Sequence, residues 1–379
     1  MKTIKILSVI GTRPEAIKMA PIINALENCQ EIDSVVCVTG QHREMLDSVL
    51  ALFQIIPDYD LNIMKKGQDL ADITCAVLSS LRRVIQECRP DILLTQGDTT
   101  TTMAASLAAY YEKITVGHIE AGLRTDDIYS PWPEEVNRKV TSAIASYHFA
   151  PTEQARLNLL GENVKDDNVI VTGNSVIDAL FGVFNGIKND TAFIGEMHTK
   201  YPFLEESNDK SLILVTGHRR ESFGGGFDEI CEALSELAKR PDVRIVYPVH
   251  LNPNVREPVF RILGGLDNVE LLEPLDYRPF IYFMHKSKII LTDSGGVQEE
   301  APSLGKPVLV MRDVTERGEA LAGGTVKLVG TNPRRIIEEV NELLDSTEVY
   351  NRMSQQSNPY GDGKASQRIL KFLLERYSK

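Results

Sequence analysis

A glycine turn between an apolar run and a helical pattern is the first place in this chain where residue types suggest chemistry. Asp293-Ser294-Gly295-Gly296 follows the apolar run 289–292, and a helical pattern begins at the turn. Free backbone N–H groups and the positive end of the helix dipole favour a bound anion there, and glycines let a phosphate come close. The turn therefore predicts a diphosphate site. The alternative is that Ser294 only caps the helix.

Charged residues follow this turn at spacings that suit a nucleotide. Glu299 and Glu300 lie one turn into the expected helix, where a carboxylate could accept two hydrogen bonds from ribose hydroxyls. A second apolar run, 307–311, leads to Arg312 and Arg317. The alternative is that the glutamates only complement the helix dipole.

Three acidic residues lie near the ends of successive strands in the first half. Asp98 follows the run 92–95, Glu120 follows the run 115–118, and Glu134 opens a later helix beside the only tryptophan. Carboxyl ends of parallel strands share one edge of a sheet, so these carboxylates are expected to converge. Each alone could be a helix cap, but capping explains three on one edge poorly. We therefore interpret them as an acid/base group.

Cationic side chains follow the first strand of each half. Gly11 to Glu15 comes after the first strand, with Pro14 in the first helical turn, so Arg13 is expected in the loop and Lys18 one turn along the helix. Two cations there suit a diphosphate, and a solvated helix start is the alternative. Only one glycine is present where the dinucleotide fingerprint needs three, and no Walker A sequence occurs.

The second half adds histidines and an aromatic residue at the same kind of position. His218 follows the strand 212–216 and could donate to a phosphate, which helps a leaving group depart. His250 occupies the equivalent place after the next strand. Phe280 could line an apolar pocket for a base, or it could be simple core packing.

Short apolar runs alternate with longer helical patterns through the whole chain, which predicts parallel strands with crossover helices. The predicted strands are 4–10, 34–39, 92–95, 115–118, 147–150 and 169–171, then 212–216, 244–248, 269–272, 289–292 and 308–311. The predicted helices include 15–28, 70–88 and 101–111, a helix opened by 132–135, and the terminal 365–377.

A polar stretch without a clear period, 186–210, separates the two series of strands. We expect two doubly wound α/β domains, at 1–175 and 176–364, with a boundary between 173 and 210. The helix in 365–379 is expected to pack back on the first domain. A ligand should then lie between the domains, at the carboxyl ends of both sheets.

Composition excludes several classes of protein. The chain has 379 residues and a net charge of -12, which argues against a general nucleic-acid or anionic-membrane binder. Five cysteines without Cys-x-x-Cys spacing favour neither zinc ligation nor a disulfide framework, and this usage fits a reducing cytoplasm. The first apolar run is too short for a signal peptide, and no run of eighteen apolar residues predicts a membrane helix.

Together these motifs resemble the non-hydrolysing UDP-N-acetylglucosamine 2-epimerases of bacteria and archaea over nearly the whole chain. The matching segments are GTRPEAIKMAP (11–21), TGQHREML (39–46), QGDTTT (96–101), HIEAGLRT (118–125), YSPWPEEVNR (129–138), GHRRES (217–222) and DSGGVQEEAPSLGKPVLVMRDVTER (293–317). Two small departures are Ser222, where the family often has Asn, and Leu275, where some members have Gln.

The resemblance implies a GT-B architecture, with two Rossmann-like doubly wound domains around a central cleft. It also implies interconversion of UDP-GlcNAc and UDP-ManNAc by anti elimination of UDP to 2-acetamidoglucal and re-addition, which supplies ManNAc for cell-surface polysaccharide. This route needs no NAD, other cofactor or metal. It implies a cytoplasmic enzyme that forms a homodimer, with no nucleic-acid or membrane partner.

The resemblance also implies roles for particular residues. The catalytic candidates are Asp98, Glu120, Glu134 and His218, with no face of C2 assigned to any one carboxylate. The substrate-binding candidates are Arg13, Lys18, Leu275 (through its backbone), Phe280, Ser294, Gly295, Gly296, Glu300 and Arg317. A second UDP-GlcNAc is expected as an allosteric activator, with candidates Gln41, His42, Gln68, Arg219, Arg220 and His250. The alternative is that 41–43 merely starts a helix.

Three rival functions have distinct requirements. A hydrolysing 2-epimerase would release UDP and free ManNAc, and the segments 11–21 and 39–46 argue against it. A GT-B glycosyltransferase would need an acceptor, and the three carboxylates argue against it. A catalytically dead nucleotide-sugar regulator is disfavoured because all three acidic positions are retained.

Overall fold

The chain forms two units, each built on one parallel sheet. The computed structural model describes residues 3–40, 43–65, 67–206, 210–315 and 317–377. Unit 1 comprises residues 1–179 together with 360–379, and unit 2 comprises residues 180–359. The chain therefore passes between the units twice, once within a helix and once after Pro359.

Unit 1 contains a seven-stranded sheet in the order β3-β2-β1-β4-β5-β6-β7, with all neighbours parallel. Its strands are β1 (Ile4–Ile10), β2 (Ile32–Val38), β3 (Tyr59–Asp60), β4 (Ile92–Gln96), β5 (Thr115–Ile119), β6 (Tyr147–Ala150) and β7 (Val169–Val171). Its helices include α1 (Arg13–Glu27), α2 (Arg43–Leu52), α3 (Leu70–Cys88), α4 (Thr100–Tyr111), α5 (Glu134–Ile144), α6 (Glu153–Gly161) and α17 (Ala365–Tyr377), with the short helix η1 (Asp166–Asn168).

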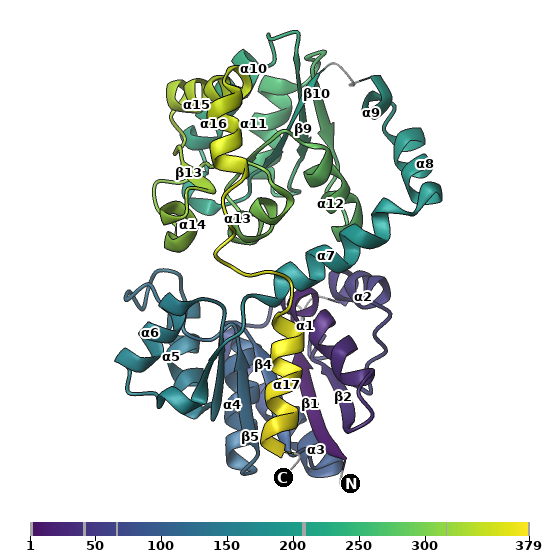
Figure 1. Cartoon of the computed structure of the whole chain (residues 1–379), viewed down its shortest axis with the longest axis vertical. Coiled ribbons are helices and arrows are strands. Elements are labelled where there is room, and N and C mark those ends of the chain that lie inside the picture. The colour runs from purple at the N-terminus through teal and green to yellow at the C-terminus, as the bar shows by residue number, and fades with distance from the viewer. Residues whose placement is uncertain (1–2, 41–42, 66, 207–209, 316, 378–379) are drawn as a thin grey trace. The chain divides into compact units, whose positions relative to one another are not determined.

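Helices cover both faces of this sheet because its strands are apolar on both sides. Ile6 and Ile10 of β1 belong to a buried cluster with α1, α2 and α17. Leu7 and Val9 point to the other face and pack in a second cluster with α3 and α4. Continuous apolar strands are typical of parallel sheets buried on both faces. Helix α17 lies beside α1, although the two are more than 300 residues apart in the chain (Figure 1).

Unit 2 contains a six-stranded parallel sheet in the order β10-β9-β8-β11-β12-β13. Its strands are β8 (Ser211–Thr216), β9 (Val243–Pro248), β10 (Val269–Leu272), β11 (Ile289–Thr292), β12 (Val308–Val310) and β13 (Val326–Leu328). Its helices are α8 (Thr191–Lys200), α9 (Phe203–Glu206), η3 (Arg220–Ser222), α10 (Gly225–Leu237), α11 (Pro253–Leu263), α12 (Tyr277–Lys286), α13 (Gly295–Glu300), η4 (Ala301–Leu304), α14 (Gly318–Ala322), α15 (Pro333–Asp345) and α16 (Thr347–Ser354). Helix α7 (Ser175–Lys188) crosses the boundary between the units.

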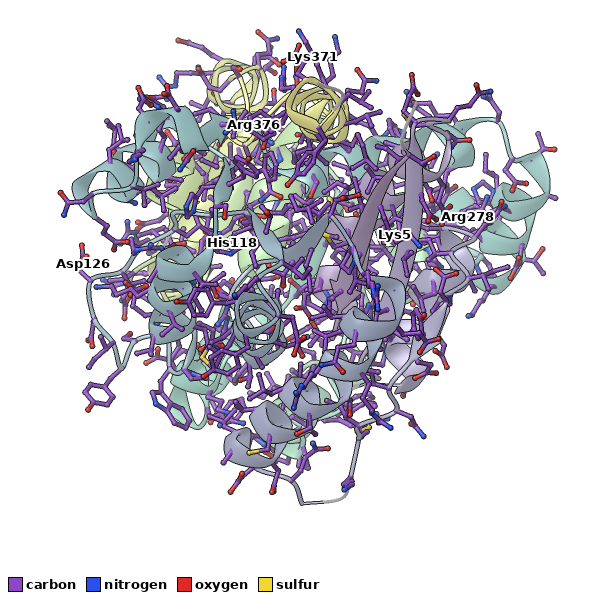
Figure 2. All side chains as sticks on the ribbon, turned by 90° about the horizontal axis from the view of Figure 1, so that it is seen from below. Lys5, His118, Asp126, Arg278, Lys371 and Arg376 are labelled. Carbon is purple, nitrogen blue, oxygen red and sulfur yellow. The ribbon has the colours of Figure 1, made fainter. Side chains whose placement is uncertain are left out.

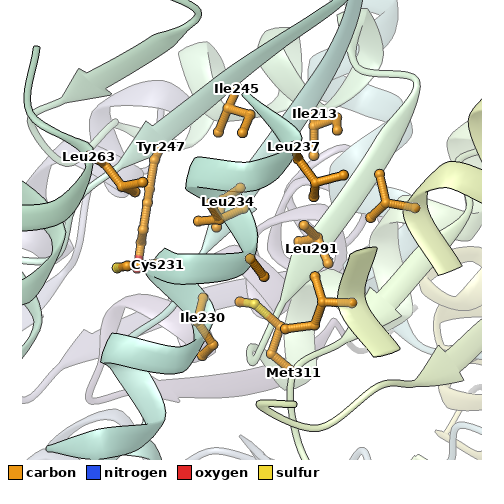
Figure 3. Close-up of a cluster of buried hydrophobic side chains, with 14 of the residues drawn as sticks. Ile213, Ile230, Cys231, Leu234, Leu237, Ile245, Tyr247, Leu263, Leu291 and Met311 are labelled. Carbon is orange, nitrogen blue, oxygen red and sulfur yellow. The ribbon is translucent and has the colours of Figure 1, made fainter. Parts of the chain in front are cut away.

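The core of unit 2 lies between its sheet and helices α10, α11 and α15. Ile213, Ile245 and Leu291, from three adjacent strands, are fully buried there against Leu234 of α10. Figure 3 shows these side chains meeting the inward face of α10. Two Rossmann-like doubly wound units in one chain make up the GT-B architecture that the sequence predicted.

The six strands of the second sheet follow the same order as the first six strands of the first sheet. In each sheet the order of the strands reverses at one point. The chain runs outward to one side of β1 through β2 and β3, and to the other side through β4. In unit 2 the corresponding pair is β8 and β11. Loops at such a switch point diverge to opposite faces of the sheet and leave a place where ligands bind in this class of fold.

Several expected elements differ from the observed ones. The short strands β3 and β13 were not predicted, and the stretch 186–210 holds the end of α7 together with α8 and α9 rather than a polar linker. Residues 222–226 contain the end of η3 and the start of α10.

Two boundaries differ as well. Helix α1 begins at Arg13, so Arg13 is its first residue rather than part of the loop. Residues 360–364 belong to unit 1, whereas the sequence assigned them to the second domain. Tyr360 is 1% exposed and its carbonyl accepts the N–H of Asn174, which ties this segment to unit 1.

Within the described ranges, the structure contains no helix that is both long and apolar enough to span a membrane.

Candidate functional site

A buried carboxylate joins the two loops at the switch point of unit 1. Glu15 is 1% exposed and accepts the backbone N–H groups of Gly11 and Thr12 at 3.1 and 2.6 Å. It also accepts the hydroxyl of Thr99, from the loop after β4, at 2.7 Å. Burial raises the pKa of Glu15, although its hydrogen bonds oppose that shift. All the partners named here are neutral, so Glu15 fixes the two loops against each other.

Glu120 lies beside this joint in a dense network of donors. Its Oε1 is 2.5 Å from Lys18 Nζ and 2.9 Å from Asn174 Nδ2, and its Oε2 accepts from Gln96 Nε2. The side chain is only 6% exposed. Three N–H donors on one carboxylate favour its ionised form.

The backbone at Glu120 is in the left-handed region, with φ of 62°. This conformation is uncommon for a residue with a side chain, and strained residues of this kind cluster at active sites as well as in turns. Gly97, at φ of 78°, faces it closely enough that a Cβ there would lie 3.6 Å from Glu120 Oε2. Glu120 therefore lies next to Gly97, the residue that precedes Asp98 in the chain.

Asp98 is held by the first turns of helix α5. Arg138 Nη2 and Nε donate to Asp98 Oδ2 at 2.6 and 3.0 Å, and Asn137 Nδ2 donates to the Asp98 carbonyl at 2.9 Å. Glu135, which is completely buried, accepts Arg138 Nη1 at 2.9 Å and so fixes the guanidinium. The Asp98 side chain remains 29% exposed, so it is oriented without being enclosed.

Glu134, the residue before Glu135, begins α5. Its Oε2 is buried and has no hydrogen-bond partner in the part of the chain that the structure describes. A buried carboxylate oxygen without a partner is costly in a purely structural role, which makes it a candidate for contact with a ligand. Unit 1 thus holds Asp98, Glu120 and Glu134 on the loops after β4 and β5 and at the start of α5.

Two buried histidines on neighbouring strands lie behind these carboxylates. His118 and His148 are paired in register on β5 and β6, and they are 0% and 1% exposed. His118 Nε2 lies 2.7 Å from the carbonyl of Gly97. Burial lowers the pKa of both imidazoles to about 4, so they are neutral near pH 7. Figure 2 shows His118 surrounded by other side chains, whereas Asp126 lies at the periphery.

A second carboxylate joins the two loops at the switch point of unit 2. Asp293, after β11, is 1% exposed, and its Oδ2 accepts the backbone N–H groups of His218 and Arg219 at 2.6 and 2.7 Å. Its Oδ1 lies 3.1 Å from His218 Nδ1. Burial alone would raise the pKa of Asp293, but the hydrogen bonds and charge of His218, together with the Arg219 N–H, hold it below its usual value.

The imidazole of His218 stacks against a second histidine. The rings of His218 and His250 are 5.8 Å apart between centroids, at an interplanar angle of 25°. Burial and the nearby His218 lower the pKa of His250. The side chain of His218 is 40% exposed, so part of its ring is open to a ligand.

The glycine turn and the glutamates after it are also anchored within unit 2. Ser294 precedes α13 but makes no side-chain capping bond. Capping of the helix by its hydroxyl therefore does not explain this residue. Glu300 Oε1 accepts the hydroxyl of Tyr277 at 2.5 Å. Glu299 accepts Arg317 Nε at 2.8 Å, and both of these side chains are largely buried.

The remaining substrate-binding candidates have simpler surroundings. A Cβ at Gly296 would lie 3.7 Å from Glu300 Oε2, so Gly296 and Glu300 are adjacent. Phe280 is half-buried in α12, and Leu275 lies in the loop before it. Lys18, predicted to meet a diphosphate, contacts the Glu120 carboxylate.

The allosteric candidates fall in both units. Gln68 accepts the N–H of Lys65 at 2.5 Å and lines a pocket of about 550 Å³ along α3. His250 Nδ1 accepts the N–H of Asn252 at 3.1 Å, and the Nε of Arg219 is buried without a partner among described residues. Arg220 begins η3. Gln41 and His42 lie outside the described residues.

Sequence reasoning missed most of the residues that hold these side chains. Glu15 stands three residues after Thr12, the spacing of a capping box, so its position at a helix start could have been recognised. Arg138 and Asn174 gave no such signal, because they act on residues 40 and 54 positions away.

Comparisons with known proteins agree over the length of the chain. The sequence model of a family described as UDP-N-acetylglucosamine 2-epimerase matches residues 24–374. The chain is 60% identical over 370 residues to a UDP-N-acetylglucosamine 2-epimerase of Yersinia pestis, covering 97% of this chain and 98% of that relative. It is 59% identical to the one of Escherichia coli strain K12, over the same shares of both chains.

Solved structures give the same result. The UDP-GlcNAc 2-epimerase of Neisseria meningitidis bound to UDP-GlcNAc is 55% identical, with a TM-score of 0.92 over 98% of this chain and 100% of that one. The enzyme of Methanocaldococcus jannaschii in complex with UDP-GlcNAc and UDP is 33% identical, with a TM-score of 0.82 over 98% and 100%.

Proposed function

Because this chain belongs to the UDP-N-acetylglucosamine 2-epimerase family, we propose that it converts UDP-GlcNAc to UDP-ManNAc reversibly and keeps UDP bound throughout. The observation that carries the proposal is the group of carboxylates in unit 1. Asp98 is paired with Arg138, and Glu120 is paired with Lys18. Glu134 follows them in the chain, at the start of α5. The substrate class is supported by the relatives from N. meningitidis and M. jannaschii, which hold UDP-GlcNAc.

The chemistry must solve one problem, because the hydrogen at C2 of the sugar is not next to a carbonyl. In the proposed route the bond from C1 to the UDP oxygen breaks, and its electron pair leaves with UDP. A base takes the proton from C2, and the electrons of that C–H bond form the C1=C2 bond of 2-acetamidoglucal. UDP then adds back to C1 while an acid delivers a proton to the other face of C2. No electron is gained or lost overall, so the route uses no redox cofactor.

Asp98, Glu120 and Glu134 are the proposed acid and base groups. Epimerisation needs proton transfer on both faces of C2, so at least two groups must act. Asp98 is oriented yet partly exposed, and Glu134 has a buried oxygen without a partner among the described residues. Glu120 receives three donors, which suits a group that stays charged and stabilises the positive character developing at C1.

The proposed UDP site lies at the start of α13 in unit 2. Backbone N–H groups of Gly295 and Gly296 and the hydroxyl of Ser294 would hold phosphate oxygens, with His218 donating to the diphosphate. The N–H of Ser294 itself donates to Thr292 Oγ1 at 3.0 Å. Glu300, fixed by Tyr277, would accept the ribose hydroxyls. Arg317 would reach the nucleotide or sugar, Arg13 and Lys18 would add positive charge to the diphosphate, and Leu275 and Phe280 would frame uracil.

Proton NMR of UDP-GlcNAc with the enzyme in deuterated water tests the proposal. We expect UDP-ManNAc to form without any acceptor, and both sugars to carry deuterium at C2. Retention of hydrogen at C2 would rule out this route. Accumulation of free ManNAc would show a hydrolysing enzyme, and turnover only with an added acceptor would show a glycosyltransferase.

We further propose a cytoplasmic homodimer that feeds cell-surface polysaccharide synthesis and is activated by a second UDP-GlcNAc. Gln41, His42, Gln68, Arg219, Arg220 and His250 are the proposed contacts of that activator. Activation predicts that UDP-ManNAc alone turns over slowly or after a lag. Full rate without added UDP-GlcNAc would refute it, and light scattering of the purified chain would test the dimer.

A further inference from the structure

We propose that Asp293 is a positioning residue that holds His218 with a proton on Nδ1 and stabilises its charged form. His218 then presents Nε2–H to the leaving diphosphate. This inference rests on the proposed function, because it assigns His218 a place beside that diphosphate. The new residue is Asp293. His218 would contact the substrate, whereas Asp293 would act only through His218.

The geometry at Asp293 divides the work between its two oxygens. Oδ2 accepts two backbone N–H groups, from His218 and Arg219, which fixes the orientation of the carboxylate. Oδ1 is buried and accepts no hydrogen bond of standard geometry from the described parts of the chain, but it lies 3.1 Å from His218 Nδ1, within ion-pair distance. An ionised carboxylate only accepts hydrogen bonds, so Nδ1 is the nitrogen that carries the hydrogen.

The other ring nitrogen is at the opposite edge of the imidazole. His218 is 40% exposed while Asp293 is 2% exposed at the side chain, so the pair has one closed end and one open end. A neutral imidazole with hydrogen on Nδ1 would offer only a lone pair at Nε2, which repels a phosphate oxygen. The imidazolium, by contrast, donates from both nitrogens, so Nδ1 can meet Asp293 while Nε2 meets the diphosphate.

Other groups around His218 do not replace Asp293. His250 stacks on the ring at 5.8 Å, and Tyr247 is a fully buried phenol on the neighbouring strand whose hydroxyl has no partner among described residues. Arg219 follows His218 in the chain and brings positive charge. Asp293 is the carboxylate in contact with the imidazole.

Asp293→Asn separates orientation from charge. The amide oxygen still accepts the two backbone N–H groups, but the amide NH₂ replaces Oδ1 and donates toward Nδ1. His218 must then carry its hydrogen on Nε2 and lose the charge. We expect kcat to fall about 100-fold, the scale of one proton-transfer or charge-stabilising group, with UDP affinity within about threefold of wild type. Asp267→Asn, an exposed aspartate of the same unit, is the matched control and should change neither value.

The direct readout is the ¹⁵N NMR spectrum of the ligand-free full chain labelled at its seven histidines, with His218→Gln used to assign the signal. We expect a protonated Nδ1 in wild type and an unprotonated Nδ1 in Asp293→Asn. Identical His218 signals in both proteins would overturn the proposal. If the variant does not fold, the wild-type spectrum decides alone, because an unprotonated Nδ1 there also overturns it.

A double-mutant cycle distinguishes action through His218 from a general structural effect. Asp293→Asn should cost little further kcat in the His218→Gln background, because the group through which it acts is already gone. Equal losses in both backgrounds would contradict the proposal. The NMR readout does not depend on epimerisation, so it can succeed or fail separately from the deuterium experiment on wild type.

Discussion

The switch points of the two units share one strand order and one construction but use it for opposite purposes. In each, a buried carboxylate joins the loop after the first strand to the loop after the fourth. Glu15 in unit 1 contacts hydroxyl and backbone groups, and burial raises its pKa. Asp293 in unit 2 contacts a half-exposed imidazole that helps to hold its pKa low. A shared scaffold therefore fixes where a carboxylate lies, and its partner decides whether it is structural or chemical.

His118 of unit 1 and His218 of unit 2 show the same contrast between a structural partner and a chemical one. His118 in unit 1 is buried, lies against a backbone carbonyl and has a pKa lowered to about 4 by burial. His218 in unit 2 is paired with a carboxylate and open on one side. In unit 1 the chemistry is therefore expected from carboxylates on neighbouring loops, and in unit 2 from the histidine.

The largest effect is expected from Asp98→Asn, which tests whether the chemistry belongs to unit 1. Asn keeps the size of the side chain and can still accept from Arg138, but it has no basicity. We expect kcat to fall at least about 1000-fold, with UDP affinity within a few-fold of wild type. An epimerisation assay and titration calorimetry with UDP measure the two quantities.

The control for this variant is Asp33→Asn, which removes an exposed ion pair with Lys5 on the far end of the sheet. It should leave kcat unchanged, because exposed pairs contribute little. A comparable loss in both variants would break the comparison, since turnover would then follow stability rather than the position of the carboxylate.

The next effect is on stability, from Glu15→Ala. The change leaves two backbone N–H groups at the start of α1 without a side-chain partner and removes the link to Thr99. We expect the free energy of unfolding to fall by about 4 kcal/mol in a urea titration. Glu27→Ala, exposed at the other end of the same helix, should cost less than about 0.5 kcal/mol. Loss of stability without loss of UDP affinity would support the view that Glu15 is structural, in contrast to Asp293, which acts on His218.

A smaller effect is expected in the pH dependence of stability, measured with His148→Gln. The pKa of His148 is lowered by burial from 6.5 to about 4 in the folded chain. Above pH 6.5 neither state binds the proton. Between pH 6.5 and 4 only the unfolded chain does, so stability falls as the pH falls, by up to about 3 kcal/mol for one imidazole.

Unfolding of the variant should take up about one proton fewer between pH 7 and 4. Its unfolding free energy should therefore fall less steeply over this range than that of wild type. A pH dependence equal to that of wild type would contradict the view that the imidazoles of unit 1 are sealed and neutral.

The smallest effect is expected from Tyr277→Phe. The change removes the hydroxyl that donates to Glu300 at 2.5 Å and leaves the ring in place. One such hydrogen bond contributes about 1 kcal/mol, so we expect UDP to bind about fivefold more weakly while kcat changes less than about twofold. Tyr350→Phe, which loses a hydroxyl bonded to the carbonyl of Lys288, is the control in the same unit. Equal affinities in both variants would mean that Glu300 does not need Tyr277.

The sequence predicted every strand of both sheets except one edge strand of each, β3 and β13. Strands such as 4–10 and 289–292 are mainly apolar runs followed directly by a glycine turn, and that pattern is sufficient to identify them. Strands β3 and β13 have two and three residues, and they exist because they extend a neighbouring strand in register. Helix α8 was missed because its apolar residues do not gather on one helical face as a clear period would require. It is anchored by an Asp190 cap and by Phe193 and Met197, four residues apart.

The sequence likewise indicated which side chains carry chemistry but not what holds them. Asp98 and Glu120 were recognisable because they follow buried strands. Arg138 and Asn174 were not, because their contacts exist only after distant segments have packed together. The start of α1 at Arg13 differed because Thr12 and Glu15 cap the helix earlier than the proline alone suggested.

The discontinuity of unit 1 has a consequence for biosynthesis. Asp178 of α7 accepts the backbone N–H groups of Ala365 and Ser366, and Ile369 and Leu373 of α17 are fully buried in the core of unit 1. A ribosome delivers this helix after every residue of unit 2. The first part of unit 1 therefore keeps an apolar surface uncovered through the whole synthesis of unit 2, until α17 has left the ribosome. Chaperone dependence during synthesis is accordingly expected to concentrate on the half of the chain that was made first.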